Sequence, residues 1–471
     1  MSIFTKEGRK VFSRKVAGFW DEYKRTKVGI AGVIILIIFA VLAIFAPFLT
    51  PYDPIISKRL AESFAQPQWV TLFPGNKDLP PTQDIPLYWT VQQSPIPLEW
   101  GKRVAFQFAA PTTDQVDIRL VFNFTYQYLP PESFNLKFSV TLEDVKDMSY
   151  FLEANLVNTT GQELNLWSYS GQADLHRLIE IQSTDYWWMS ARGYTPGKDN
   201  VAKIWFAQRG QYSVTLDIRL MPKTTASTIS LKVEDSMFNI PGLVHGLLGA
   251  DNEGRDLWSQ LIYGSRISLA IGLLAAGLAT SLGIIIGVIS GYVGGAVDEI
   301  IMRIVDILLA LPVLPLLLAL IFLFGPNVFY IIFLIAVFGW QGLSRVIRSQ
   351  VLSLREALFV ECARASGASK AYIMFKHLVP NVLPIAFASL VLSVPGAILT
   401  EAALSFLGFG DPKAATWGKM LQSAFGFGAF SNLAWWWILP PGLAITFVCL
   451  AFVLIGHAVD NIVNPRLRRR R

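Results

Sequence analysis

Charged side chains interrupt the most apolar half of this chain. Between two apolar runs stands the stretch FVECARASGASKAYIMFKHLVPN, residues 359–381, which contains Glu361, Arg364, Lys370 and Lys376. Charged residues on a frame of alanines and aromatic residues suit recognition of a partner's surface, in which an apolar patch is seated within a charged rim. The chemistry predicted for this stretch is therefore binding, and no catalytic residue is expected in it.

Two short helices must position these residues. An apolar stripe leads up to Gly367, whose freedom at positive φ suits a helix end, and Ser369 can cap a second helix that ends at Pro380. Two helices at an angle, over about 353–378, would form a projecting knob. The alternative is a plain loop between spans, but helical connections usually take about two to eight residues. The first stripe comprises Leu354, Leu358, Cys362 and Ala365, and the second comprises Ala371, Phe375 and Leu378.

Long apolar segments flank this knob. Hydrophobic residues make up 53% of the 471 residues and charged residues 16%, which excludes an ordinary soluble globule. Because about 20 apolar residues in a helix cross a bilayer, the pattern predicts a polytopic α-helical membrane protein with six transmembrane helices. Glycines 283, 287 and 291 would let a neighbouring helix approach the second span closely. The predicted spans are 28–49, 267–292, two within 307–343 that Gly325-Pro326-Asn327 separates, 379–400 and 435–459.

Basic residues predict the orientation of the spans. They are concentrated in the N-terminal segment 1–27, beside the knob and in the tail 461–471, which six spans place on one side. The positive-inside rule makes that side the cytoplasm, although the inner loop around Asp298 and Glu299 is not enriched in basic residues. The N-terminal segment is either an amphipathic helix along the inner leaflet or a disordered basic tail. The helix would use Phe12, Val16, Phe19 and Trp20 as its apolar face.

A polar segment, residues 51–245, lies between the first and second spans and alternates with period two. In DIRLVFNFTYQY (117–128) and YSVTLDIRL (212–220) every second residue is apolar, as in strands with one buried face. The pattern predicts an inserted extracytoplasmic, mainly-β, sandwich-like domain without cysteine. Further strands are predicted at 136–141, 177–181, 202–208 and 228–233.

The knob also resembles a known family. Its pattern E-x-A-x-x-x-G followed by H-x-x-P-N is similar to the cytoplasmic coupling motif of ABC importer permeases of the oligopeptide/dipeptide/nickel branch, second permease subunit type. Similar segments are APFLTPYDP (46–54), LLGADNEGRDLWSQLIYGSRISL (247–269), DEIIMRIVDILLALP (298–312), TEAALSFLGFG (400–410), Trp417-Gly418 and NPRLR (464–468). The sequence departs from the pattern at Cys362, where the family usually has alanine, and in a large domain between about 67 and 245, where relatives usually have a short loop. The residues implied to couple to an ATPase are Glu361, Cys362, Ala363, Gly367, His377 and Pro380.

The resemblance implies a transport machine with several partners. A second homologous permease subunit, two ABC ATPase subunits and an extracytoplasmic substrate-binding protein are expected, together with the lipid bilayer and no nucleic acid. ATP and magnesium are expected on the ATPase subunits, because the chain contains no G-x-x-x-x-G-K-[ST] phosphate loop. The chain itself is then no enzyme. It is expected in the cell membrane of a prokaryote, with five of the helices in a permease core at 246–460 and both termini in the cytoplasm.

Other charged groups have structural explanations as well as functional ones. Arg303 can pair with Glu299 or Asp306 within two turns, as a helix pair or as part of a gate. Glu401 begins a segment outside the fifth span, which the resemblance places at an external gate and which could equally be a helix cap. His457 has no ligand residue at metal spacing, so no metal site is predicted.

The cargo is left open by the sequence. Peptides are expected, with oligosaccharides or nickel as alternatives for the same machinery, and a membrane-anchored sensor or scaffold as the alternative of another class. The aromatic residues of the β-rich domain could stack on sugars, contact a binding protein or fill the core. We expect the domain to dock or enclose the binding protein. The residues concerned are Trp167, Tyr169, Tyr186, Trp187, Trp188 and Tyr194, and the N-x-T sequons begin at Asn123 and Asn158.

Overall fold

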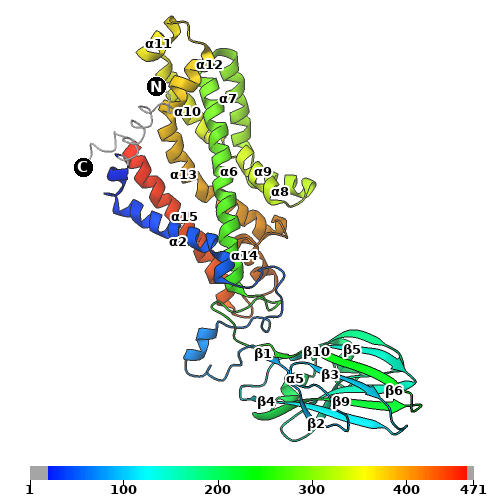
Figure 1. Cartoon of the computed structure of the whole chain (residues 1–471). Helices are drawn as coiled ribbons and strands as arrows, with labels where there is room; N and C mark the ends of the chain where they lie inside the picture. Colours follow the sequence, from blue (N-terminus) through cyan, green and yellow to red (C-terminus); the bar gives the residue numbers. More distant parts are fainter. Residues whose placement is uncertain (1–17, 19, 464–471) are drawn as a thin grey trace. The chain divides into compact units, whose positions relative to one another are not determined.

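Helices and strands separate into two compact units. This computed structural model describes residue 18 and residues 20–463 of the chain. The helical unit comprises Met1–Ile56 and Leu257–Arg471, and the β unit comprises Ser57–Asp256 (Figure 1). The predicted separation of a β-rich region from a set of apolar helices is confirmed. The predicted amphipathic face at Phe12, Val16 and Phe19 lies outside the described residues, as does the tail from 464 onward.

The helical unit is built from long apolar helices and short polar ones. Its first helices stand before the β unit in the sequence, and the others follow it. In chain order they are α2 (Lys27–Ile44), α3 (Ala46–Leu49), α6 (Leu257–Val293), α7 (Gly295–Ala310), α8 (Val313–Phe324), α9 (Val328–Val337), α10 (Gln341–Arg355), α11 (Leu358–Ala365), α12 (Lys370–Ile373), η2 (Met374–Leu378), α13 (Val379–Leu404), η3 (Ser405–Phe409), α14 (Trp417–Gly426) and α15 (Trp435–Val463).

Among the described residues, four helical segments are long and apolar enough to cross a membrane. They are Lys27–Ile44, Leu257–Val293, Lys370–Phe409 and Trp435–Ile462. Two further pairs qualify only as bent helices, since α7 and α8 meet at 88° and α9 and α10 at 40°. The prediction that one straight helix begins at 307 is wrong. Helix α7 begins earlier and ends at Ala310, and α8 begins at Val313, after Pro312, which has no N–H to continue a helix. The inner loop predicted around Asp298 and Glu299 is also wrong, since both residues lie in α7.

Glycines bring α10 close to α6. A Cβ atom on Gly287 would lie 2.7 Å from the Ser344 carbonyl oxygen, and one on Gly291 would lie 2.9 Å from the Arg348 carbonyl oxygen. No side chain fits at these separations, so only glycine lets the two backbones approach in this way. The close approach predicted for the glycine series is therefore confirmed, and α10 is the neighbouring helix.

The β unit consists of two five-stranded antiparallel sheets (Figure 1). One sheet has the order β1-β10-β5-β8, with β3 also pairing with β10, and the other has the order β2-β4-β9-β6-β7. The strands are β1 (Gln83–Pro86), β2 (Thr90–Gln93), β3 (Val104–Ala109), β4 (Val116–Tyr126), β5 (Asn135–Lys146), β6 (Met148–Val157), β7 (Glu163–Gly171), β8 (Leu175–Gln182), β9 (Gly210–Pro222) and β10 (Thr228–Ile240).

Both sheets contribute side chains to one core. The alternating apolar residues 118–126 of β4 and 212–220 of β9 pack in this core, and all of them are buried except Phe122, which is partly buried. Aromatic rings form its centre, where the rings of Phe206 and Tyr212 stack at 4.6 Å. The strand predicted at 202–208 is wrong, because residues Val201–Trp205 form the helix α5. Its cap explains the difference, since the Asn200 side chain accepts a hydrogen bond from the Lys203 N–H.

Candidate functional site

The predicted knob is a hairpin of two helical arms, Leu358–Leu378, at one end of the helical unit (Figure 1). The first arm, α11, ends at a turn in which Gly367 has a φ of +77°. There the Ala368 N–H donates to the Ala363 carbonyl at 3.1 Å, a bond that suits a glycine-terminated helix. The second arm, α12 and η2, begins where the Ser369 side chain accepts from the Tyr372 N–H. Both signals predicted from the sequence thus act in the hairpin.

The inner face of the hairpin is anchored in the helical unit. Val360, Ile373 and Leu378 are almost completely buried. They belong to one apolar cluster with residues of α6, α10 and α13, so both arms pack on the same three helices. Because close-packed interiors deform little, a displacement of the hairpin would be passed to those helices. The cluster also contains Val288, Tyr292, Ile347, Val351, Val382 and Ala386.

The outer face of the hairpin is apolar and exposed. Leu358 and Phe375 leave 75% and 71% of their surface exposed, and Tyr372 leaves 52%. The predicted stripes are only partly correct. Leu354 packs against the inner cluster and Leu378 belongs to it, whereas Leu358, Cys362, Ala365, Ala371 and Phe375 are exposed.

The motif residues divide between the two faces. Glu361, Cys362, Gly367 and Pro380 are exposed, and Ala363 packs against the inner cluster. The His377 ring lies 6.1 Å from the Phe359 ring of the first arm and 5.7 Å from the Tyr372 ring of the second. His377 thus lies between the arms, and the Asn381 side chain donates to its carbonyl oxygen at 2.6 Å. The hairpin thus presents to a partner an apolar surface with the carboxylate of Glu361 beside it. These residues do not form a site for covalent catalysis.

Two ion pairs join α7 to α10 near the hairpin. Arg348 donates from Nε and Nη2 to the two carboxylate oxygens of Asp298, each at 2.5 Å, and the Ser290 hydroxyl donates to the same carboxylate. Arg345 pairs with Asp306. The predicted pairing of Arg303 with Glu299 or Asp306 is not what the structure contains, since no ion pair of Arg303 occurs among the described residues. Sequence reasoning missed the Asp298–Arg348 pair because 50 residues separate the partners.

Glu401 lies inside α13 rather than at its start. It is buried and accepts a hydrogen bond from the Ser405 hydroxyl at 2.6 Å. The helix therefore continues beyond residue 400, where the fifth span is predicted to end, and Glu401 is not a helix cap. In the part of the chain that the structure describes, no three His, Cys, Asp or Glu residues gather as a candidate metal site.

Two family descriptions match this chain. "Binding-protein-dependent transport system inner membrane component" matches residues 283–469, which include the hairpin. "N-terminal TM domain of oligopeptide transport permease C" matches residues 16–69, which include α2. Most of the β unit lies between the two matched ranges.

Curated relatives align with about half of the chain. A Brucella suis protein named as a peptide transport system permease is 38% identical over 232 residues, which are 49% of this chain and 77% of the relative. The dipeptide transport system permease protein of Bacillus subtilis is 36% identical, over 49% of this chain and 72% of its own. The oligopeptide transport system permease protein of the same organism is 38% identical, over 47% and 72%. A solved structure titled "CBM4 structure and function" aligns with 33% of this chain and 88% of its own at 12% identity, with a TM-score of 0.20.

Proposed function

Because this chain belongs to the family of binding-protein-dependent transport system inner membrane components, we propose that it is one permease subunit of an ATP-driven importer of di- and oligopeptides. The names of the relatives support the peptide cargo. In this proposal each bent helix pair crosses the bilayer once, so that the chain has six spans with cytoplasmic termini. The β unit is then an extracytoplasmic domain inserted after the first span. A homologous permease subunit supplies the other half of the pathway.

The two-faced hairpin carries this proposal. Two partner ATPases bind ATP and magnesium, and the groove of one ATPase receives the exposed face around Leu358, Glu361 and Phe375. When the ATPases close on ATP, the hairpin moves with them. Its anchors Val360 and Ile373 then carry the movement into α6, α10 and α13, because the inner cluster is close-packed.

The importer is tested by ATP hydrolysis. The complex is purified through this chain, reconstituted with its extracytoplasmic binding protein, and challenged with short peptides, oligosaccharides and nickel. We expect ATPase subunits to co-purify and peptides to stimulate hydrolysis. Stimulation by oligosaccharides or nickel alone would keep the machinery and replace the cargo, whereas the absence of a co-purifying ATPase would favour a sensor or scaffold.

Coupling is tested at two positions of the hairpin. Glu361→Ala and Gly367→Pro are expected to lower transport at least about tenfold, a loss of about 1.4 kcal/mol of coupling, while the protein stays in the membrane. The control is Glu356→Ala, which removes an exposed carboxylate that pairs with the neighbouring Arg355. Undiminished transport by Gly367→Pro would contradict the assignment of the hairpin.

A further inference from the structure

A groove of about 600 Å³ runs along one side of the β unit. Its walls are β7 and β8, which stand at the ends of their two sheets, and α4 (Tyr186–Ser190) lies beside them. Within the described strands β7 pairs only with β6, and β8 pairs only with β5. Each wall therefore has one backbone edge without a neighbouring strand. Leu166 and Trp167 line the groove from β7, Leu178, Ile179 and Glu180 from β8, and Trp188 from α4.

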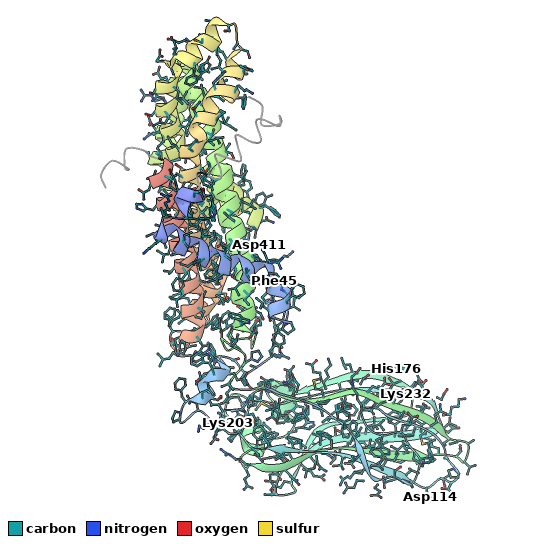
Figure 2. The ribbon with its side chains drawn as sticks, turned by 60° about the vertical axis from the view of Figure 1, so that its left-hand side comes forward. Phe45, Asp114, His176, Lys203, Lys232 and Asp411 are labelled. Carbon is teal, nitrogen blue, oxygen red and sulfur yellow. The ribbon has the colours of Figure 1, made fainter. Side chains whose placement is uncertain are left out.

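The hydrogen-bond register of β8 with β5 shows which residues of β8 direct their main-chain N–H and C=O groups away from β5. The Ser183 N–H donates to the Phe134 carbonyl at 3.0 Å, in continuation of the register that pairs Ile181 with Leu136 and Ile179 with Phe138. Hydrogen-bonded pairs alternate along an antiparallel ladder. The N–H and C=O groups of Leu178 and Glu180 consequently point away from β5. Leu178 is also 57% exposed, and Figure 2 shows its neighbour His176 at the surface of the β unit.

The opposite wall is closed by side chains. The Trp188 indole N–H and the Arg192 Nη2 both donate to the Leu166 carbonyl at 2.7 Å, and Arg192 Nε donates to the Asn165 carbonyl. The Arg192 guanidinium lies 4.4 Å from the centre of the Trp188 ring, and burial lowers the pKa of this arginine. The outer edge of β7 is thus capped here, while that of β8 is left open. Edge strands with open backbone groups are templates for a further strand.

The aromatic rings in the groove are engaged with the protein. Trp167 stacks on Tyr169 at 6.1 Å with an angle of 3°, and its edge contacts Phe138. Arg192 covers one face of Trp188. Sugar recognition would use free aromatic faces, whereas this groove offers the main-chain donors and acceptors of Leu178 and Glu180, together with polar side chains such as Ser168 and Arg177. A protein partner would bury about 800 Å² on each side, and a groove of this volume suits a small ligand.

We propose that this groove binds a short peptide in extended conformation, as an added strand along β8. Leu178 and Glu180 would exchange main-chain hydrogen bonds with about three residues of the peptide. Recognition through the main chain accepts many sequences, which is what a carrier of mixed oligopeptides requires. The identification of the ligand as cargo peptide rests on the proposed function, and the groove would hold cargo on the β unit in addition to any site on the binding protein.

The test uses the full chain, with its partners, in lipid nanodiscs. The probe is fluorescent pentaalanine, and its matched control is the same peptide with N-methyl groups on alternate residues, which remove donors of a ladder. We expect the N-methylated peptide to bind at least about tenfold more weakly, the effect of losing one or two hydrogen bonds. Hydrogen exchange at Leu178 and Glu180 should slow with pentaalanine and stay unchanged with the control peptide.

Two variants at Leu178 distinguish the contribution of its main-chain N–H to peptide binding from that of its side chain. Leu178→Pro replaces the leucine side chain and removes the N–H that faces the groove, while the N–H groups that pair with β5 remain, a change that edge strands tolerate. It should weaken pentaalanine binding at least about tenfold. Leu178→Ala keeps that N–H and should bind within about twofold. Equal binding by Leu178→Pro, equal binding of the N-methylated peptide, or binding of a cello-oligosaccharide without pentaalanine would overturn the proposal. Co-purifying ATPase activity is measured on the same samples, so that failure of the groove and failure of the importer are told apart.

Discussion

Asp298 forms its ion pair with Arg348. Arg348 binds both of its carboxylate oxygens. The Arg348 side chain is 33% exposed, and that of Asp298 is 16% exposed. We expect Arg348→Ala to lower the free energy of unfolding by about 1–3 kcal/mol, because it leaves a half-buried carboxylate without its cation. The matched control is Arg345→Ala, whose ion pair with Asp306 is about half exposed and should contribute less than about 1 kcal/mol. Titration with SDS in mixed micelles measures both variants, and equal losses would contradict this assignment.

Glu62 in the β unit makes a prediction about pH. Burial raises its pKa above the ordinary value of 4.5, and the hydrogen bond from the Ser133 hydroxyl opposes this only in part. A carboxyl whose pKa is raised on folding contributes stability below its unfolded pKa and loses it as the pH rises through the folded value. Glu62→Gln should therefore be more stable than the parent at pH 7 and closer to it at pH 4.5.

Hydrogen exchange of β-unit peptides during a urea titration measures this difference in the full chain. The control is Glu143→Gln, whose carboxylate is 44% exposed and pairs with Lys232 at 3.5 Å. The same pH dependence in both variants would show that burial of Glu62 is not its cause.

At the scale of elements, the contact of α6 with α10 depends on glycine. Gly287 and Gly277 lie in the same helix, but a Cβ atom would clash only at Gly287, since nothing lies within 4 Å of Gly277. Gly287→Ala should destabilise the helical unit by about 1–3 kcal/mol through overpacking. Gly277→Ala should be neutral or stabilising by up to about 1 kcal/mol, because alanine favours the helix. Thermal unfolding in detergent compares the two, and a harmless Gly287→Ala would mean that the helices can separate without cost.

Elements with a local signal could be predicted from the sequence, and elements that depend on distant partners could not. Alternation revealed β4 and β9, and Gly367 and Ser369 revealed the turn of the hairpin, because each signal acts within a few residues. The strand at 177–181 is likewise predicted from the sequence, but its open edge is not, because that edge follows from the place of β8 at the end of a sheet. The segment 202–208 is apolar enough for a strand, yet the cap at Asn200 makes it helical. Likewise, nothing local to Asp298 indicates a partner 50 residues away.

At the scale of the whole molecule, the chain enters and leaves the β-sandwich at one place. The His245 N–H donates to the Gln66 carbonyl at 2.8 Å, and the Gly242 N–H donates to the Thr82 hydroxyl at 3.1 Å. In the sheet, Gln83 at the start of β1 pairs with Ile240 at the end of β10. Close entry and exit points are typical of inserted domains and let them be removed without stretching the remainder. They also explain how a permease family accommodates a domain that the matched ranges leave out.

Removal of the sandwich should accordingly leave a folded permease. The variant joins Thr82 to Pro241 through a two-residue Asn-Gly turn and so lacks residues 83–240, which contain all ten strands. We expect it to insert in the membrane and to co-purify with the ATPase subunits, because the hairpin and its anchors belong to the helical unit. The affinity of this variant for the binding protein then tests the docking role predicted for the domain. If the domain docks the binding protein, the variant should bind that protein more weakly than the parent does. A variant that assembles and binds the binding protein with unchanged affinity would contradict the docking role, so that peptide binding in the groove would be the remaining function proposed for the domain. A variant that fails to assemble would show that the sandwich is needed to fold the helices.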